Sequence, residues 1–210
     1  MATTTTHYKP LEPILIDIPL PIETPRLRLE IDQPGFGQHL HVMKEETWDD
    51  LLQWMPWAHS DPRSLDADEI NCRKAYAQFI LRQDMRMVGF EKATGRPVMM
   101  TGLHRFDWTA RHFEIGYWVR RSAQGQGYAT EAALALTRFA FEALQARRVE
   151  ITHAEGNERS RNVIEKLGFV REAIRKDDAV MPDGRVMTHY EYVRFDTAGL
   201  PPLDIRWRDK

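Results

Sequence analysis

The chain contains one cysteine, almost no net charge and no long hydrophobic run, and each shortage excludes a class of protein. Cys72 has no second cysteine to pair with, so an internal disulfide framework is excluded and a reducing compartment is indicated. The 29 basic and 31 acidic residues leave a formal net charge of −2, which provides no basic field for a nucleic acid. We therefore expect no nucleic-acid partner, and we expect Cys72 to be a small packing residue.

Segments that enter or cross a membrane are also missing. No apolar run approaches the roughly 18 residues that a membrane helix needs, and no signal-peptide core is visible. The sequence thus predicts a cytoplasmic protein without a membrane partner. Its 210 residues, of which 42% are hydrophobic, suffice for one domain with a full core and leave little room for a second.

The most informative stretch is residues 113–169. Residues 115–119 have the aromatic and β-branched content of a buried strand. A turn with Gly125 and Gly127 follows and leads directly into a helix. Small apolar residues recur along this helix at the three-to-four spacing that gives one narrow face: Ala129, Ala132, Ala133, Leu136, Ala140 and Ala143.

A glycine turn at the start of a helix suits a phosphate group. Glycine has no Cβ, so the backbone can approach an anion closely, and the first helical N–H groups lack internal partners. Two common nucleotide motifs do not fit. A Walker A loop needs Gly-Lys-Ser/Thr, but Tyr128 and Ala129 follow Gly127; a dinucleotide fingerprint needs a third glycine where Thr130 stands. A glycine-softened turn with no ligand stays open at this point.

The pattern that does fit is Gln/Arg-x-x-Gly-x-Gly/Ala, met by Gln124, Gly127 and Ala129. It resembles the acetyl-CoA pyrophosphate loop of the GNAT superfamily of N-acetyltransferases. A strand over residues 149–152, then Asn157, a short helix and a Leu-Gly-Phe ending at residues 167–169 are similar to the same superfamily. With residues 114–118, Glu-Ile-Gly-Tyr-Trp, the chain resembles the RimJ/RimL-type branch of ribosomal-protein N-acetyltransferases.

The resemblance implies an α/β (α+β) fold with a mixed, mostly antiparallel central sheet, whose middle strands splay into a V-shaped cleft flanked by helices. We expect an N-terminal arm over residues 1–23, an acetyltransferase domain over 24–195 and a tail over 196–210. The arm has three prolines among its apolar residues, so it should be extended and should either lie on the domain or contribute a dimer contact. A homodimer therefore stays open.

Local patterns predict the remaining elements. Ser160 can cap the short helix, and Gly168 suits the left-handed position after it. The sequence further predicts a strand over residues 23–30, one or two short helices in 33–57, a helix over 65–84, a hairpin of strands 85–92 and 97–105, and strands 171–181 and 185–195.

The resemblance implies acetyl-CoA as co-substrate and no metal. Its pyrophosphate would take backbone N–H groups of the glycine turn, its pantetheine arm would pair with the strand edge at residues 117–119, and Asn157 would hold the arm from the other side. Arg120, Arg121 and Arg161 would add charge near the phosphates. The cofactor-binding residues expected on this basis are Tyr117, Trp118, Val119, Gln124, Gly125, Gln126, Gly127, Tyr128, Ala129, Thr130, Asn157, Ser160 and Arg161.

Acetyl transfer to an amine needs a group that takes the amine's proton. The resemblance points to Glu114 as this base, with an edge-strand glutamate facing solvent as the alternative. Many superfamily members have a tyrosine as general acid seven residues after the asparagine, where this chain has Ile164. Ser160 is the expected substitute, although it can equally be a simple cap, and Tyr190 is a weaker candidate. His104 fits a polar residue at a strand end better than a catalyst.

The acceptor side is the least patterned part of the chain. Trp54 and Trp57 flank Pro56 and should form a rigid aromatic corner, either at the substrate cleft or as a plug under a loop. Asp61, with the acidic residues at 66, 68 and 69, could line a funnel for polyamines or aminoglycosides.

These features predict an acetyl-CoA-dependent N-acetyltransferase that acts on a primary amine, either a protein N-terminal α-amino group or a small molecule, by direct attack in a ternary complex. The alternative is a non-catalytic acyl-CoA-binding or sensing domain of the same fold. The intact loop and Glu114 argue against it, and the missing tyrosine favours it. The acceptor and the length of the acyl chain stay open.

Overall fold

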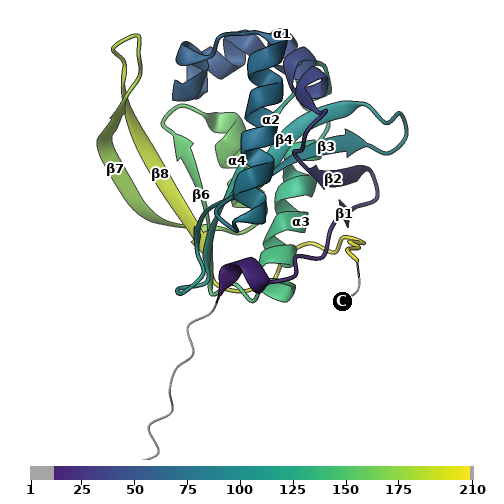
Figure 1. The fold of residues 1–210 in the computed structure, drawn as a ribbon. Helices are drawn as coiled ribbons and strands as arrows, with labels where there is room; N and C mark the ends of the chain where they lie inside the picture. Colours follow the sequence, from purple (N-terminus) through teal and green to yellow (C-terminus); the bar gives the residue numbers. More distant parts are fainter. Residues whose placement is uncertain (1–11, 209–210) are drawn as a thin grey trace, which may run out of the picture.

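The computed structural model describes residues 12–208, which form one eight-stranded sheet in the order β1-β2-β3-β4-β5-β6-β8-β7 (Figure 1). Only the β5–β6 pair is parallel, so the predicted mixed and mostly antiparallel sheet is confirmed. The strands are β1 Ile22–Glu23, β2 Leu27–Ile31, β3 Met85–Glu91, β4 Pro97–Asp107, β5 His112–Val119, β6 Arg148–Ala154, β7 Val170–Val180 and β8 Val186–Arg194. The helices are α1 Gly37–Trp54, α2 Leu65–Ile80, α3 Tyr128–Glu142 and α4 Glu158–Lys166, with 3-10 turns η1 Pro13–Leu15, η2 Pro56–Ser60 and η3 Arg121–Ala123.

Helices cover both faces of the sheet. Side chains of β3 alternate: Met85 and Met87 face α3, whereas Val88 joins a second cluster with Leu40 of α1 and Cys72 of α2. The narrow apolar face predicted for α3 is buried against the first side. Cys72 is fully buried, as expected of a packing residue. None of the helices in the described part of the chain is long and apolar enough to cross a bilayer.

The sheet opens at its centre. β5 and β6 pair only from His112↔Arg148 to Glu114↔Glu150. Beyond that point β5 stays paired with β4 as far as Val119, and β6 stays paired with β8 as far as Ala154. The second halves of β5 and β6 therefore border a gap, which confirms the predicted splay.

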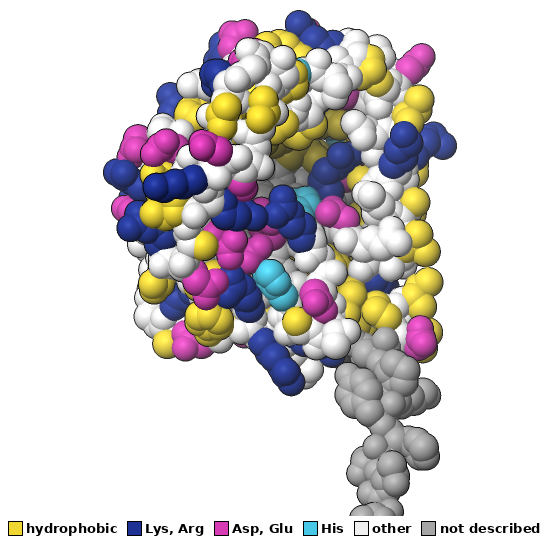
Figure 2. Space-filling view, turned by 90° about the vertical axis from the view of Figure 1, so that its left-hand side faces the viewer, with side chains coloured by type: hydrophobic (Ala, Val, Ile, Leu, Met, Phe, Trp, Pro, Cys, Tyr) yellow, Lys and Arg dark blue, Asp and Glu magenta, His cyan; other side chains and the backbone are white. Residues whose placement is uncertain are grey.

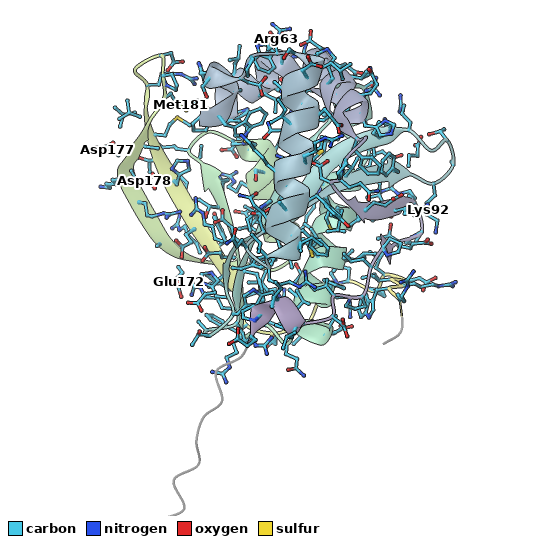
Figure 3. The ribbon with its side chains drawn as sticks, in the orientation of Figure 1. Arg63, Lys92, Glu172, Asp177, Asp178 and Met181 are labelled. Carbon is cyan, nitrogen blue, oxygen red and sulfur yellow. The ribbon has the colours of Figure 1, made fainter. Side chains whose placement is uncertain are left out.

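A small hydrophobic cluster joins the two halves of the sheet beside this gap. Trp54, the last residue of α1, packs against Ala154 at the end of β6 and against Met181 and Met187 of the β7–β8 hairpin. Figure 3 shows Met181 on the inner side of the hairpin, whereas Asp177 and Asp178 lie on β7 near its outer side. The turn that predicts this hairpin, Pro182-Asp183-Gly184, lies where the sequence places it.

Both chain ends that the structure describes lie against the domain. Ile16, Ile18 and Leu20 of the predicted arm pack on the core, and the Glu23 backbone exchanges hydrogen bonds with Arg206 of the tail. The Trp207 ring meets Phe139 of α3 edge-on. Residues 1–11 of the predicted arm lie outside the described residues.

Two local expectations were wrong. Residues 33–57 do not form short helices but one 18-residue helix, α1, followed by the η2 turn. The predicted strand over 23–30 is interrupted between β1 and β2. At this break Thr24 donates a hydrogen bond to Glu131 of α3 (2.6 Å), and the Arg26 N–H donates to the same carboxylate (3.0 Å). Tertiary bonds to α3 thus end the first strand early.

Candidate active site

The turn before α3 is a cradle of backbone N–H groups. Gly125 and Gly127 have φ angles of +73° and +84°, a left-handed conformation that favours glycine. Gly127 is the N-cap of α3, and no side chain caps it. Within residues 12–208, no hydrogen-bond acceptor binds the backbone N–H groups of Gly125, Gln126, Gly127, Tyr128, Ala129 and Thr130. This cradle fits the pyrophosphate of acetyl-CoA, because it presents unpaired donors at the positive end of a helix dipole.

Helix α1 fixes the approach to the cradle. The Glu46 carboxylate accepts hydrogen bonds from the Ser122 N–H (2.6 Å) and from Arg120. Burial opposes the ionisation of Glu46, but these two partners outweigh it and lower its pKa to about 2. Thr47 accepts a hydrogen bond from the Arg121 N–H (3.1 Å). No motif in the sequence marks Glu46 or Thr47, so sequence reasoning missed them.

Gln124, the first residue of the loop motif, also holds the loop in place. Its Nε2 donates to Asp50 of α1 (2.9 Å) and to the Val119 carbonyl (3.1 Å), and its Oε1 accepts from Arg159 (2.6 Å). Its backbone N–H donates to Arg121 (3.2 Å). The donors expected from Gln124 are thus already in use, so the six unpaired N–H groups begin at Gly125.

Arg26 is a second residue that sequence reasoning did not connect with this site. Its Nη1 donates to the Gln126 carbonyl (2.8 Å), and its Nε donates to Glu131 in the first turn of α3 (2.6 Å). Its guanidinium lies over the Tyr128 ring, 4.7 Å from the centroid. Tyr128 is itself buried and donates to Glu91, so its side chain packs the loop against the sheet.

The edge of β5 presents backbone groups to the gap. The Arg120 N–H donates to Val98 of β4 (2.9 Å), and backbone groups of a strand alternate in direction. Trp118 therefore faces β4, whereas Tyr117 and Val119 face the gap. Three residues were predicted to pair with a pantetheine arm, and in two of them, Tyr117 and Val119, the backbone groups point toward the gap.

Tyr117 and Ser160 meet across the gap. Their hydroxyl oxygens are 2.9 Å apart, and burial raises the pKa of Tyr117 to about 12. Ser160 is not the cap of α4: Asn157 is, because its Oδ1 accepts the Ser160 N–H (3.2 Å). Helix α4 therefore begins about one turn earlier than it would with Ser160 as its cap. The Ser160 hydroxyl does not take part in capping. Ile164 is fully buried, and Gly168 has the predicted left-handed conformation.

The structure does not bring the three predicted catalytic side chains together. Strand alternation places Glu114 on the α1–α2 face of the sheet and Tyr190 on the opposite face, stacked on His153. The Tyr190 hydroxyl donates to Glu155 (2.7 Å). Glu114 is 15% exposed and lies 3.1 Å from Arg105. Burial raises the pKa of Glu114; Arg105 opposes this rise and Glu150 adds to it.

The predicted arginines near the phosphates are paired with carboxylates. Arg161 contacts Glu158 (2.5 Å) and Glu165 (3.7 Å) on its own helix. Arg120 contacts Glu46, and Arg121 contacts Asp49 (3.3 Å). Each of these positive charges is therefore largely compensated before any ligand arrives.

A cavity of about 480 Å³ lies on the α1–α2 face, between these helices, η2 and strands β4 and β5. Figure 2, which faces the β7–β8 side of the view in Figure 1, shows a hollow with hydrophobic side chains at its back and charged and histidine side chains around it. Trp57 lines the cavity and is 41% exposed, whereas Trp54 belongs to the cluster beside the gap. Its lining also includes Lys44, Asp61, Arg86, Met100, His104 and Trp118.

A buried ion network supports the η2 lip of this cavity. Lys44 of α1 donates to Asp61 and to Asp68, both at 2.5 Å, and all three side chains are at most 5% exposed. Asp68 also contacts His41 (2.8 Å), and Glu69 binds the N–H of Gly35 (3.1 Å). Asp61, Asp68 and Glu69, three of the four acidic residues that could have lined a funnel, are thus held by internal partners, and Asp66 is exposed. Over residues 12–208 no cluster of three or more His, Cys, Asp or Glu side chains is placed to hold a metal ion.

Comparisons with known proteins agree with this geometry. Residues 32–170 match the family described as "Acetyltransferase (GNAT) domain". A 78-residue segment is 44% identical to the "Putative ribosomal N-acetyltransferase YdaF" of Bacillus subtilis (strain 168); the match spans 37% of this chain and 43% of that protein. A crystal structure of a "Probable acetyltransferase" is 27% identical, with a TM-score of 0.74, over 81% of this chain and 93% of its own. "RimL- Ribosomal L7/L12 alpha-N-protein acetyltransferase" in complex with coenzyme A is 18% identical, with a TM-score of 0.77, over 83% and 97%.

Proposed function

Because this chain belongs to the GNAT acetyltransferase family, we propose that it transfers an acetyl group from acetyl-CoA to a primary amine, by direct attack in a ternary complex. One observation carries the proposal: a cradle of six unpaired N–H groups lies at one end of a gap in the sheet, and an open cavity of about 480 Å³ lies beside the same strand, β5. Donor and acceptor sites that meet at one strand are what direct transfer needs, since it depends on holding both reactants together.

The donor side has groups for each part of acetyl-CoA. The cradle at 125–130 would hold the pyrophosphate, and the backbone of Tyr117 and Val119 would bind the pantetheine arm as an added strand. The Asn157 Oδ1 is used in capping, but its Nδ2 donates to none of the residues that the structure describes, so it is available to the arm. When bound, acetyl-CoA supplies the activated acetyl thioester.

The acceptor side favours a protein or peptide α-amino group over a polycation. Asp61 is the carboxylate that lines the cavity, and it is paired with Lys44; Arg86, which also lines the cavity, is paired with Asp32. A polyamine or aminoglycoside would find no unpaired negative charge there. An α-amino group has an ordinary pKa of about 7.7–8.0, against about 10.4 for lysine, so more of it is neutral and nucleophilic at pH 7. The names of the two similar ribosomal-protein enzymes support the same class.

A second candidate function is binding of an acyl-CoA without transfer. One observation favours it. Many relatives have a tyrosine that acts as general acid at this position, whereas this chain has Ile164, which is fully buried. The Ser160 hydroxyl, beside Tyr117, is the substitute donor on which the enzymatic proposal relies.

Thermal melting with acetyl-CoA, followed by a thiol-release assay, separates the two functions. We expect saturating acetyl-CoA to raise the Tm, because a ligand that binds only the folded state stabilises it. We then expect CoA release with peptides that have a free N-terminus and none with the same peptides N-acetylated, with spermidine or with kanamycin. A rise in Tm without release on any amine would favour the binding function, and release on spermidine alone would contradict the acceptor class.

A further inference from the structure

We infer that His104, oriented by Asp84, takes the proton from the acceptor amine; this inference rests on the proposed acetyl transfer. His104 lies on β4 and lines the cavity. Its Nδ1 is 2.8 Å from Oδ2 of Asp84, which directly precedes β3. A carboxylate accepts hydrogen bonds, so Asp84 holds the proton of the neutral ring on Nδ1 and leaves Nε2 as a base.

The Nε2 edge of the ring lies against the backbone of β5. A Cβ added at Gly116 would come within 2.9 Å of Cδ2 and 3.1 Å of Nε2, so only a glycine lets the ring occupy this place. The next residue, Tyr117, faces the gap proposed for the pantetheine arm. Nε2 is therefore at the border between the acceptor cavity and the donor gap, where an amine must lose its proton to react.

The other titratable groups around His104 are already paired. Lys44 and Asp61 bind each other, and Arg86 of β3 contacts the fully buried Asp32 (2.6 Å). Lys44 and Arg86 are cations and have no site for a further proton, and Asp61 would lose its buried partner Lys44 on protonation. His104 is left as the cavity-lining side chain with an available basic nitrogen.

Glu114, the base expected from the sequence, is the cross-strand neighbour of His104. Arg105 would point to the opposite face in a regular strand, but its φ of +50° and the register shift after His104 bring it to Glu114. Glu114 does not line the cavity. Glu114 instead provides a nearby negative charge, which stabilises the imidazolium that forms when His104 accepts the proton.

The step balances as a proton transfer coupled to acyl transfer. The ammonium form of the acceptor gives one proton to His104 Nε2. The neutral amine then forms a C–N bond with the acetyl carbon as the C–S bond breaks, and the second amine proton is lost to solvent. The CoA sulfur takes up a proton, so an amide and free CoA result, and His104 releases its proton to bulk water.

The test compares pH–rate profiles of wild type, His104→Ala and His104→Gln with a free N-terminal peptide. We expect kcat at pH 6.5 to fall about 100-fold in both variants, with acetyl-CoA affinity unchanged by calorimetry. At pH 9 most of the peptide amine is already neutral, so the deficit should shrink to less than about tenfold. Added imidazole should restore part of the activity of His104→Ala, which has space for it, and none of that of His104→Gln.

A variant of the orienting carboxylate, Asp84→Asn, gives a second measurement. We expect a smaller fall in kcat with little change in KM, because Nε2 keeps its place while its tautomer is no longer fixed. A long-range ¹H–¹⁵N spectrum of the free wild-type enzyme should show the His104 ring protonated at Nδ1 near pH 8, and His104→Gln identifies the signal. This spectrum is recorded without an acceptor amine, so it does not depend on the identity of the substrate.

Several results would overturn the inference. Full activity of His104→Gln at pH 6.5, a deficit equal at every pH without imidazole rescue, or a ring protonated only at Nε2 would each do so while leaving the proposed acetyl transfer intact. A wild-type protein that binds acetyl-CoA but releases no thiol with any amine would remove both proposals together.

Discussion

The cradle proposed for acetyl-CoA, at the start of α3, and the cavity proposed for the acceptor, beside β4 and β5, are built in different ways. The cradle consists of backbone: six N–H groups, two left-handed glycines and the start of α3. The cavity consists of side chains, and its η2 lip is held by Lys44 through ion pairs with Asp61 and Asp68. A backbone site needs few particular residues at fixed spacing, whereas a side-chain site depends on partners distant in the sequence.

Helix α1 serves both sites. Lys44 turns toward the cavity, and Glu46, two residues later, turns toward the loop that leads to the cradle. Two residues on a helix are about 200° apart, so neighbours in the sequence support opposite sides. Changes in α1 should therefore separate the two sites, and changes in the glycine turn should affect only one.

The largest effect should come from breaking the ion network of the cavity. We expect Lys44→Met to lower the free energy of unfolding by about 3–5 kcal/mol, because Asp61 and Asp68 would be left as buried carboxylates without a cation. Urea unfolding at pH 7 measures this change. Lys74→Met on the exposed side of α2 is the matched control and should change stability by less than about 0.5 kcal/mol. Equal stability of the two variants would show that the network contributes little.

The next largest effect should appear in the cradle. We expect Gly127→Val to weaken acetyl-CoA binding about 100-fold or more, or about 2.7 kcal/mol, because a β-branched residue is strained at a φ of +84° and its side chain would occupy the anion's place. Calorimetry measures the affinity. Gly95→Val carries a similar strain, with a φ of +70°, in the β3–β4 turn. It should lose stability but keep the affinity, and an equal loss of affinity in both would refute the cradle.

The cradle was easier to predict from the sequence than the cavity, because a backbone site needs only a few residues at fixed spacing. Glycines at 125 and 127, the alternating residues of the strands and the small residues on one face of α3 can all be recognised from residue type and spacing. The sequence placed a strand edge at residues 117–119 without its direction; backbone alternation leaves Tyr117 and Val119, but not Trp118, facing the gap. The error of the prediction at Ser160 was one of local competition, since both Asn157 and Ser160 can cap a helix.

The cavity could not be predicted in the same way. Asp61 and Asp68 looked like solvent-facing acids because the sequence does not show that Lys44 is buried between them. His104 looked like an ordinary strand-end residue because its two partners, Asp84 and Gly116, come from different strands or loops. Pairings across the sheet have no fixed spacing, so no motif records them.

The support that α1 gives to the cradle should depend on pH. The folded-state pKa of Glu46 is about 2, below its ordinary value of 4.5, so its ionised form stabilises the folded protein above pH 4.5 and this contribution is lost as the pH falls toward 2. We expect Glu46→Gln to cost about 1–2 kcal/mol at pH 7, since partial exposure screens the interaction. Unfolding measured from pH 7 to 3 should show the difference between wild type and variant shrinking below pH 4.5. A constant difference would mean that packing, not charge, is lost.

The smallest effect should separate the two tryptophans that flank Pro56. Trp57 lines the cavity and lies 5.9 Å from Lys44 Nζ, so we expect Trp57→Ala to raise KM for a peptide acceptor about 5- to 10-fold, or about 1–1.4 kcal/mol, with the acetyl-CoA affinity and stability nearly unchanged. Trp54→Ala is the matched comparison. Trp54 joins α1 to Ala154 and Met181 across the gap, so its loss should lower stability by about 2 kcal/mol and affect KM less. If both variants raise KM alike, the aromatic corner acts as one unit, and the division between a substrate-facing and a structural tryptophan fails.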